Sequence, residues 1–157
     1  MPASYKNSGM KVPEASAHCD PEAKLNVFVA YDDVPAGQHA MRVIGNVDRQ
    51  IEEFKKQYPS LWRFDLLEDP DWRLLATAEA LQADLLVISA SSCRNDLPGG
   101  VRTWIETCLE QKKGTAAAVV ALLGSGEHLD PPDSPRIQFL KNATEAVGLD
   151  FFAPGAD

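Results

Sequence analysis

Two adjacent aspartates, Asp32 and Asp33, follow directly after the apolar segment 25–31. Two carboxylates this close repel each other, so such a pair either binds a divalent cation through its oxygens or raises the pKa of one member. The sequence therefore predicts a candidate Mg²⁺ site at Asp32 and Asp33. The alternative is structural: one aspartate caps the helix that follows, while the other stays in solvent.

The segment from Ser89 to Leu97 holds further side chains that could do chemistry. An arginine next to a cysteine lowers the pKa of the thiol, and a cysteine nucleophile would take His39 or His128 as its base. Nothing in the spacing requires either histidine to be close, and a loop cysteine without a chemical task is the commoner case. The crevice candidates in this segment are Ser91, Ser92, Cys93 and Arg94.

A third candidate, Ser125, lies between Gly124 and Gly126. Glycines at this position could let backbone N–H groups surround an anion. A dinucleotide-binding fingerprint would need a third glycine and an immediate helix, but Pro131 and Pro132 follow. We therefore expect a turn between a strand and a helix. None of these segments contains a complete catalytic set, so we assign no catalytic residue.

Alternating strand and helix patterns must position these groups. Apolar runs predict five strands, at 25–31, 61–67, 85–88, 116–123 and 149–152. Apolar residues three and four positions apart predict the buried faces of four helices. These residues are Met41, Ile44, Val47, Ile51 and Phe54 in the first helix, Leu74, Leu75, Ala78 and Leu81 in the second, Val101, Trp104, Ile105, Cys108 and Leu109 in the third, and Ile137, Leu140 and Val147 in the fourth.

Five strands joined by helical crossovers specify a parallel sheet with helices on both faces. The predicted fold class is therefore α/β, a three-layer sandwich around a five-stranded parallel sheet. The commonest strand order for such a sheet is the flavodoxin-like 2-1-3-4-5, in which ligands bind at the carboxyl edge beside the first and third strands. Asp32, Asp33, the segment after the third strand and Ser125 would all lie at that edge.

The chain has 157 residues, a formal net charge of −8 and a pI of about 4.8. We expect a flexible N-terminal arm, 1–24, and one domain, 25–157. The negative charge argues against binding to nucleic acid or to an anionic membrane surface, and no apolar stretch approaches the ~20 residues of a membrane helix. Three cysteines without CxxC spacing favour free thiols and a cytoplasmic location.

The stretch 27–33, VFVAYDD, resembles the first strand of bacterial response-regulator receiver domains, which ends in an acidic pair that helps to bind Mg²⁺. The resemblance extends over about 25–155, and Ser125 would match the hydroxyl residue of receiver strand 4. Receivers also carry a phosphoacceptor aspartate at the end of strand 3 and a lysine before a proline after strand 5. Here those places read ISAS at 88–91 and AP at 153–154. The resemblance implies a degenerate receiver that phosphorylation cannot switch.

The stretch 83–101 resembles flavodoxin-like NAD(P)H-dependent FMN reductases, in which a strand ends in a flavin-contacting loop and a Pro-Gly pair opens the next helix. Strand 62–67 and the Lys113-Gly114 step also resemble that family. Its phosphate site is a loop rich in Ser, Thr, Gly and Asn after the first strand, but here that loop reads DDVPAG. Two carboxylates repel the FMN phosphate and Pro35 removes a backbone donor, so FMN is disfavoured as the cofactor.

Two hypotheses of different classes follow. The first is a small cytoplasmic, non-catalytic regulatory or interaction module of the degenerate-receiver type. It would have a protein partner or associate with itself as a homodimer, and Trp72 on the first turn of a helix is the candidate contact. The alternative is an FMN-binding NAD(P)H-dependent oxidoreductase of flavodoxin-like fold. A hydrolase or transferase that uses Cys93 is a third, weaker hypothesis.

Overall fold

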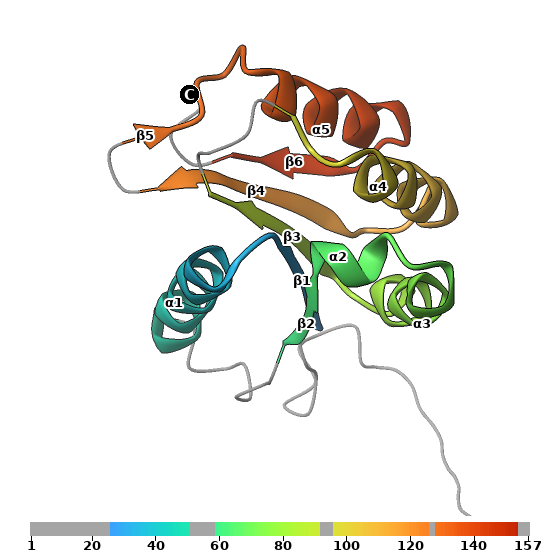
Figure 1. Ribbon diagram of the computed structural model, residues 1–157, viewed down its shortest axis with the longest axis horizontal. Helices are drawn as coiled ribbons and strands as arrows, with labels where there is room; N and C mark the ends of the chain where they lie inside the picture. Colours follow the sequence, from blue (N-terminus) through green and yellow to red (C-terminus); the bar gives the residue numbers. More distant parts are fainter. Residues whose placement is uncertain (1–25, 51–58, 92–95, 126–127, 154–157) are drawn as a thin grey trace, which may run out of the picture.

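Five parallel strands form the central sheet, in the order β2-β1-β3-β4-β6 (Figure 1). The computed structural model describes residues 26–50, 59–91, 96–125 and 128–153, without the side chains at 46–50, 125 and 128. The strands are β1 (Val27–Tyr31), β2 (Ser60–Arg63), β3 (Leu85–Ala90), β4 (Ala118–Ser125) and β6 (Asp150–Phe152). The predicted parallel sheet with 2-1-3-4-5 order is confirmed, with β6 as its fifth strand.

A short strand that the sequence does not predict follows β4. Strand β5 (His128–Leu129) runs antiparallel to the end of β4, where Gly124 pairs with Leu129. Residues 128–129 therefore lie back against the end of β4.

Helices cover both faces of the sheet (Figure 1). On one face lies α1 (Val34–Gln50), where Ala40 packs with Val29, Val87 and Leu122. The other face carries the larger core and the helices α2 (Phe64–Leu67), α3 (Pro70–Leu81), α4 (Gly99–Gln111) and α5 (Pro135–Ala146). These layers confirm the predicted three-layer sandwich. No helix in the described part of the chain is both long and apolar enough to cross a membrane.

Local sequence signals set the helix ends. The Asp69 side chain accepts a hydrogen bond from the backbone N–H of Asp71 at 2.9 Å, and Ser134 accepts one from Ile137 at 3.1 Å. Both residues stand before a proline that begins a helix. Gly114, which follows α4, has a φ of 87°, a conformation that glycine adopts without steric cost.

The second predicted strand is wrong at its carboxyl end. The pattern predicts a strand over 61–67, but β2 ends at Arg63 and the next four residues form the single turn α2. Phe64 and Leu67, three positions apart, are both buried on the core side. A helical turn allows this, whereas a strand would send the two side chains to opposite faces of the sheet.

The buried face of α3 also differs from the prediction. Leu74 and Leu75 are 76% and 56% exposed, whereas Ala76 and Ala80 are fully buried. The largest apolar side chains of this helix therefore face away from the core, although their spacing predicts the opposite.

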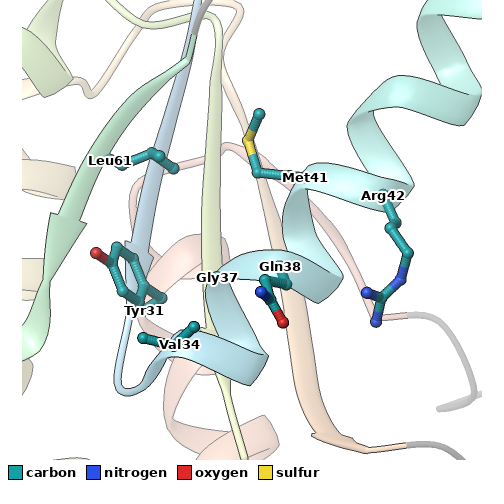
Figure 2. Close-up of a pocket in the computed structure, with 7 residues that line it drawn as sticks. All are labelled: Tyr31, Val34, Gly37, Gln38, Met41, Arg42 and Leu61. Carbon is teal, nitrogen blue, oxygen red and sulfur yellow. The ribbon is translucent and has the colours of Figure 1, made fainter.

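Met41 of α1 does not face the sheet as predicted. Its side chain is 37% exposed and lines an open groove of about 520 Å³ between α1 and the edge strand β2 (Figure 2). Ala40 takes the place against the sheet. Ile51 and Phe54, from the same predicted stripe, lie outside the described residues. The other residues that line the groove are Tyr31, Val34, Gly37, Gln38, Arg42 and Leu61.

Candidate functional site at the carboxyl edge of the sheet

The segments that follow β1 and β3 meet because these strands are neighbours in the sheet. Tyr31 pairs with Ser89, and the backbone N–H of Asp32 donates to the Ser89 carbonyl at 3.2 Å. The Ser89 hydroxyl in turn donates to the carbonyl of Ala36, in the first turn of α1, at 2.8 Å. Strand order alone therefore brings the acidic pair and Ser91 to one place, as the sequence predicts.

Asp33 caps α1 and accepts the hydroxyl of Ser91. Its Oδ1 accepts from the backbone N–H of Ala36 at 3.0 Å, and Ser91 Oγ lies 2.8 Å from each carboxylate oxygen. Burial by itself raises the pKa of Asp33, but the hydrogen bonds from Ala36 and Ser91, with a contribution from Asp32, lower it below its ordinary value. Asp33 therefore acts as the ionised helix cap of the structural alternative.

Asp32 has the opposite tendency. The backbone N–H of Ser91 donates to both of its carboxylate oxygens at 3.2 Å. Burial raises the pKa of Asp32; the Ser91 N–H opposes this rise, the neighbouring charge of Asp33 adds to it, and Arg136 opposes it more weakly. Burial and the repulsion from Asp33 thus raise the pKa of Asp32 and not that of Asp33. The structural alternative expects this second aspartate to be in solvent, but Asp32 is partly buried.

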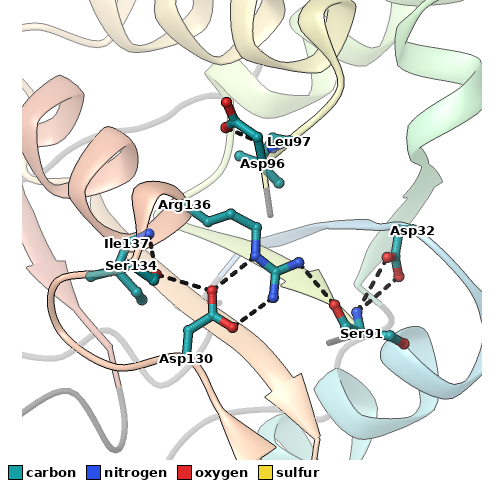
Figure 3. Close-up of polar contacts among 8 residues, drawn as sticks. All are labelled: Asp32, Ser91, Asp96, Leu97, Asp130, Ser134, Arg136 and Ile137. Carbon is teal, nitrogen blue, oxygen red and sulfur yellow. Dashed lines mark hydrogen bonds and ion pairs between the residues drawn. The ribbon is translucent and has the colours of Figure 1, made fainter. Parts of the chain in front are cut away.

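A buried arginine that the sequence analysis did not single out joins this cluster from α5 (Figure 3). The side chain of Arg136 is 2% exposed, and its Nε and Nη2 donate to the two carboxylate oxygens of Asp130 at 2.9 and 2.7 Å. Its Nη1 donates to the carbonyl of Ser91 at 2.8 Å. Burial raises the pKa of Asp130, but the hydrogen bonds and charge of Arg136, with the hydroxyl of Ser134, lower it overall.

One signal in the sequence points to this pair. Arg136 stands in the first turn of a helix that begins after Ser134, where the helix dipole disfavours a positive charge. Asp130 lies six positions earlier and supplies the compensating carboxylate. A cation at a helix start with an acid just upstream is therefore a pattern that could have identified both residues.

The arrangement is a closed polar network, in which each carboxylate accepts hydrogen bonds from within the protein. The Ser91 hydroxyl is directed at Asp33, and a carboxylate with a lowered pKa is a weak base for activating it. Among the residues that the structure describes, no group of three or more His, Cys, Asp or Glu side chains is placed to hold a metal ion. Mg²⁺ at Asp32 and Asp33 thus stays a prediction with two protein carboxylates as its ligands.

The remaining crevice candidates cannot be placed in the same detail. Ser92, Cys93 and Arg94 lie outside the described residues, and so does the side chain of Ser125. The backbone of Ser125 ends β4 and pairs with His128 of β5. Of the candidates whose side chains are described, Ser91 contacts the acidic pair.

No protein-family model matches this chain, and no curated protein matches it either. The site is therefore interpreted from its own geometry.

Proposed function

We propose that the protein is a non-catalytic regulatory or interaction module of the degenerate-receiver type, acting in the cytoplasm. One observation carries the proposal: Ser91, directly after β3, hydrogen-bonds to both Asp32 and Asp33. In the receiver resemblance this is the region of the phosphoacceptor aspartate. A serine here supplies internal hydrogen-bond donors to the acidic pair and offers no carboxylate to phosphorylate.

The position of the positive charge at this edge, on Arg136 of α5, supports the same proposal. Where a receiver has its lysine, after the last strand, this chain has Ala153, which packs against the apolar core. Arg136 acts on Asp32 from α5, but its guanidinium is committed to Asp130 and to the Ser91 carbonyl. A group held by three hydrogen bonds is not free to follow a phosphoryl group, so we expect this edge to be fixed and not to switch.

The flavin alternative gains no support from this edge. The carboxylate of Asp33 already accepts from the backbone N–H of Ala36, one of the donors that a phosphate would use at the start of α1. A dianionic phosphate would have to displace a carboxylate whose pKa is lowered. We therefore expect the purified protein to be colourless.

Phosphoryl transfer gives the direct test. The full chain is incubated with acetyl phosphate and Mg²⁺, beside a receiver domain that retains its phosphoacceptor aspartate, and both are examined by intact-mass spectrometry. We expect the control to gain a phosphoryl group and this protein to gain none. Stable uptake that disappears in Asp32→Asn or Asp33→Asn would overturn the proposal.

Ligand-dependent thermal unfolding gives a second test, with Mg²⁺ and FMN each added alone. Stabilisation that grows with ligand concentration reports binding to the native state. A shift with Mg²⁺ that is lost in Asp32→Asn would confirm the predicted cation site. A shift with FMN, together with flavin absorbance of the complex, would instead favour the oxidoreductase alternative.

A further inference from the structure

Large apolar side chains are exposed on β2, an edge strand of the sheet, and on the two helices beside it. Among the described residues, eight large hydrophobic side chains are exposed, and six of them lie on α1, β2 and α3. These six, with exposed fractions from 37% to 76%, are Val34, Met41, Leu61, Trp72, Leu74 and Leu75. Scattered single apolar residues are normal on a protein surface, but a concentration on three neighbouring elements marks an interaction site.

Helices α1 and α3 flank strand β2 on its two faces. Strand β2 lies at the end of the sheet and pairs with β1 alone among the described strands. On one side of it, Leu61 and Met41 line the groove against α1 (Figure 2). On the other side, the ring of Trp72 on α3 lies 6.1 Å from the ring of Trp62 on β2. The edge of β2 therefore runs between two apolar borders.

We propose that this β2 edge, formed by β2 with the adjoining surfaces of α1 and α3, is the interface through which two copies of the chain form a homodimer. Antiparallel pairing of the two β2 strands about a twofold axis would make the two sheets continuous and satisfy the outward backbone groups of Ser60–Arg63. The apolar borders of one copy would then meet those of the other.

The size of the apolar surface favours a second copy over a small ligand. Val34, Met41 and Leu61 in the groove, with Trp72 beside Trp62, present an exposed apolar area on the order of several hundred Å², a substantial part of the about 800 Å² that each partner buries in a standard interface. The chain has a net charge of −8, so two copies repel at long range. An interface of apolar side chains and backbone hydrogen bonds adds little to that repulsion, and salt should strengthen the dimer by screening it.

This inference deepens the proposed function, because it names the partner and the surface of the interaction module. The two can fail separately. A monomer that takes up no phosphoryl group would overturn the dimer and leave the non-catalytic proposal standing. A dimer that is phosphorylated at Asp32 or Asp33 would support the dimer and overturn the non-catalytic proposal.

Sedimentation equilibrium of the full chain, at low and high salt, tests the dimer. We expect a dimer whose dissociation constant falls as salt rises. Leu61→Lys and Leu75→Glu, at exposed sites where the fold should tolerate the change, should each weaken the dimer at least tenfold. The matched control is Phe152→Lys, which changes an exposed apolar residue on β6, the edge strand at the other end of the parallel sheet, and should leave the dimer intact.

Hydrogen exchange provides an independent measurement on the unmodified protein. We expect the β2 amides to become better protected as the protein concentration rises, while the β6 amides do not change. A wild-type chain that stays monomeric at high micromolar concentration would overturn the inference. A dimer that Phe152→Lys disrupts and Leu61→Lys preserves would overturn it as well, because the interface would then lie at the opposite edge.

Discussion

A guanidinium buried at the end of a sheet must have its charge compensated from within the protein. Arg136 is nearly inaccessible to solvent, and its partner Asp130 is 14% exposed. The pair ties the start of α5 to the segment after β3 through the Ser91 carbonyl. Removing one member of a buried ion pair is costly, because the other charge is left in a poorly solvated place.

We predict that Arg136→Met lowers the free energy of unfolding by about 3 kcal/mol, because Asp130 then keeps a single hydroxyl partner. The control is Arg102→Met, which removes a half-exposed ion pair with Asp96 at 3.3 Å. That change should cost about 1 kcal/mol or less. Urea denaturation of both variants makes the comparison, and equal losses would show that the Arg136 network does not stabilise the fold.

Asp130 and Asp32 should affect the pH dependence of the free energy of unfolding in opposite directions. The pKa of Asp130 is lowered in the fold, so its stabilisation is present above the ordinary value of 3.8 and is lost as the pH falls through the folded value. The pKa of Asp32 is raised, so its contribution is fully present below 3.8 and is lost as the pH rises through the folded value.

We therefore predict that Asp32→Asn is more stable than the wild type at neutral pH, and that the difference shrinks on acidification. Asp130→Asn should be less stable than the wild type at neutral pH, and that difference should also shrink as the pH falls. Urea denaturation between about pH 3 and pH 7 measures both. An Asp32→Asn variant less stable than the wild type at neutral pH would show that the ionised carboxylate is favoured in the fold.

At the scale of elements, α3 shows why apolar spacing can mislead. Its inward positions are small, and the space beside them is filled by two tryptophans from other elements. The indole N–H of Trp62 donates to Glu79 at 2.8 Å, and that of Trp104 donates to Thr77 Oγ1 at 2.9 Å. If the helix were rotated so that Leu74 or Leu75 faced inward, the leucine would compete for this volume and the acceptors Thr77 and Glu79 would turn away from the indoles. The tryptophans of β2 and α4 therefore determine which face of α3 is buried.

The end of α3 depends on a buried lysine that directly follows α4. Lys112 is buried, and its Nζ donates to the carbonyls of Ala80, Leu81 and Ala83 at 3.0, 3.3 and 2.7 Å. Burial lowers the pKa of Lys112. A cation at the carboxyl end of a helix also meets the favourable end of the helix dipole.

We predict that Lys112→Met lowers the free energy of unfolding by about 1–3 kcal/mol, because three backbone carbonyls lose a charged donor. The neighbouring Lys113 is exposed and gives a matched control. Lys113→Met should change the stability by less than about 0.5 kcal/mol. Thermal unfolding at one pH compares them, and similar effects at both positions would contradict a capping role for Lys112.

At the scale of the whole molecule, stability should fall from the centre of the sheet to its edge. Strand β3 lies between β1 and β4, and its residues from Leu86 to Ala90 are almost fully buried. Strand β6 pairs with β4 through three residues, and Phe152 is 55% exposed. Few pairings and high exposure make local opening easy.

We predict that the β3 amides exchange hydrogen only through global unfolding, whereas the β6 amides exchange through local opening. Native-state hydrogen exchange across low denaturant concentrations distinguishes the two regimes. The β3 rates should depend on denaturant as steeply as global unfolding, and the β6 rates only weakly. Equal dependence in both strands would mean that the sheet opens as one unit.

The architecture and the place of the site could be predicted from the sequence because both depend on local patterns. Buried apolar runs that alternate with helix-spaced segments predict a parallel sheet whose strands are connected by helices. The commonest strand order for such a sheet is the one that the structure has. That order places the ends of β1 and β3 side by side, so Asp32, Asp33 and Ser91 had to meet. The caps at Asp69 and Ser134 were predictable for the same reason, since each bond spans two or three residues.

The tertiary structure alone decided how those groups behave. The pKa of Asp32 is raised and that of Asp33 is lowered because of residues far apart in the chain. The contact of Arg136 with Ser91, 45 positions away, and the buried face of α3 depend on such residues as well. Burial, charge and available volume are properties of the packed neighbours, and the residue's own segment does not contain them. The sequence therefore predicted where the polar site forms, whereas packing decided that it is a closed network.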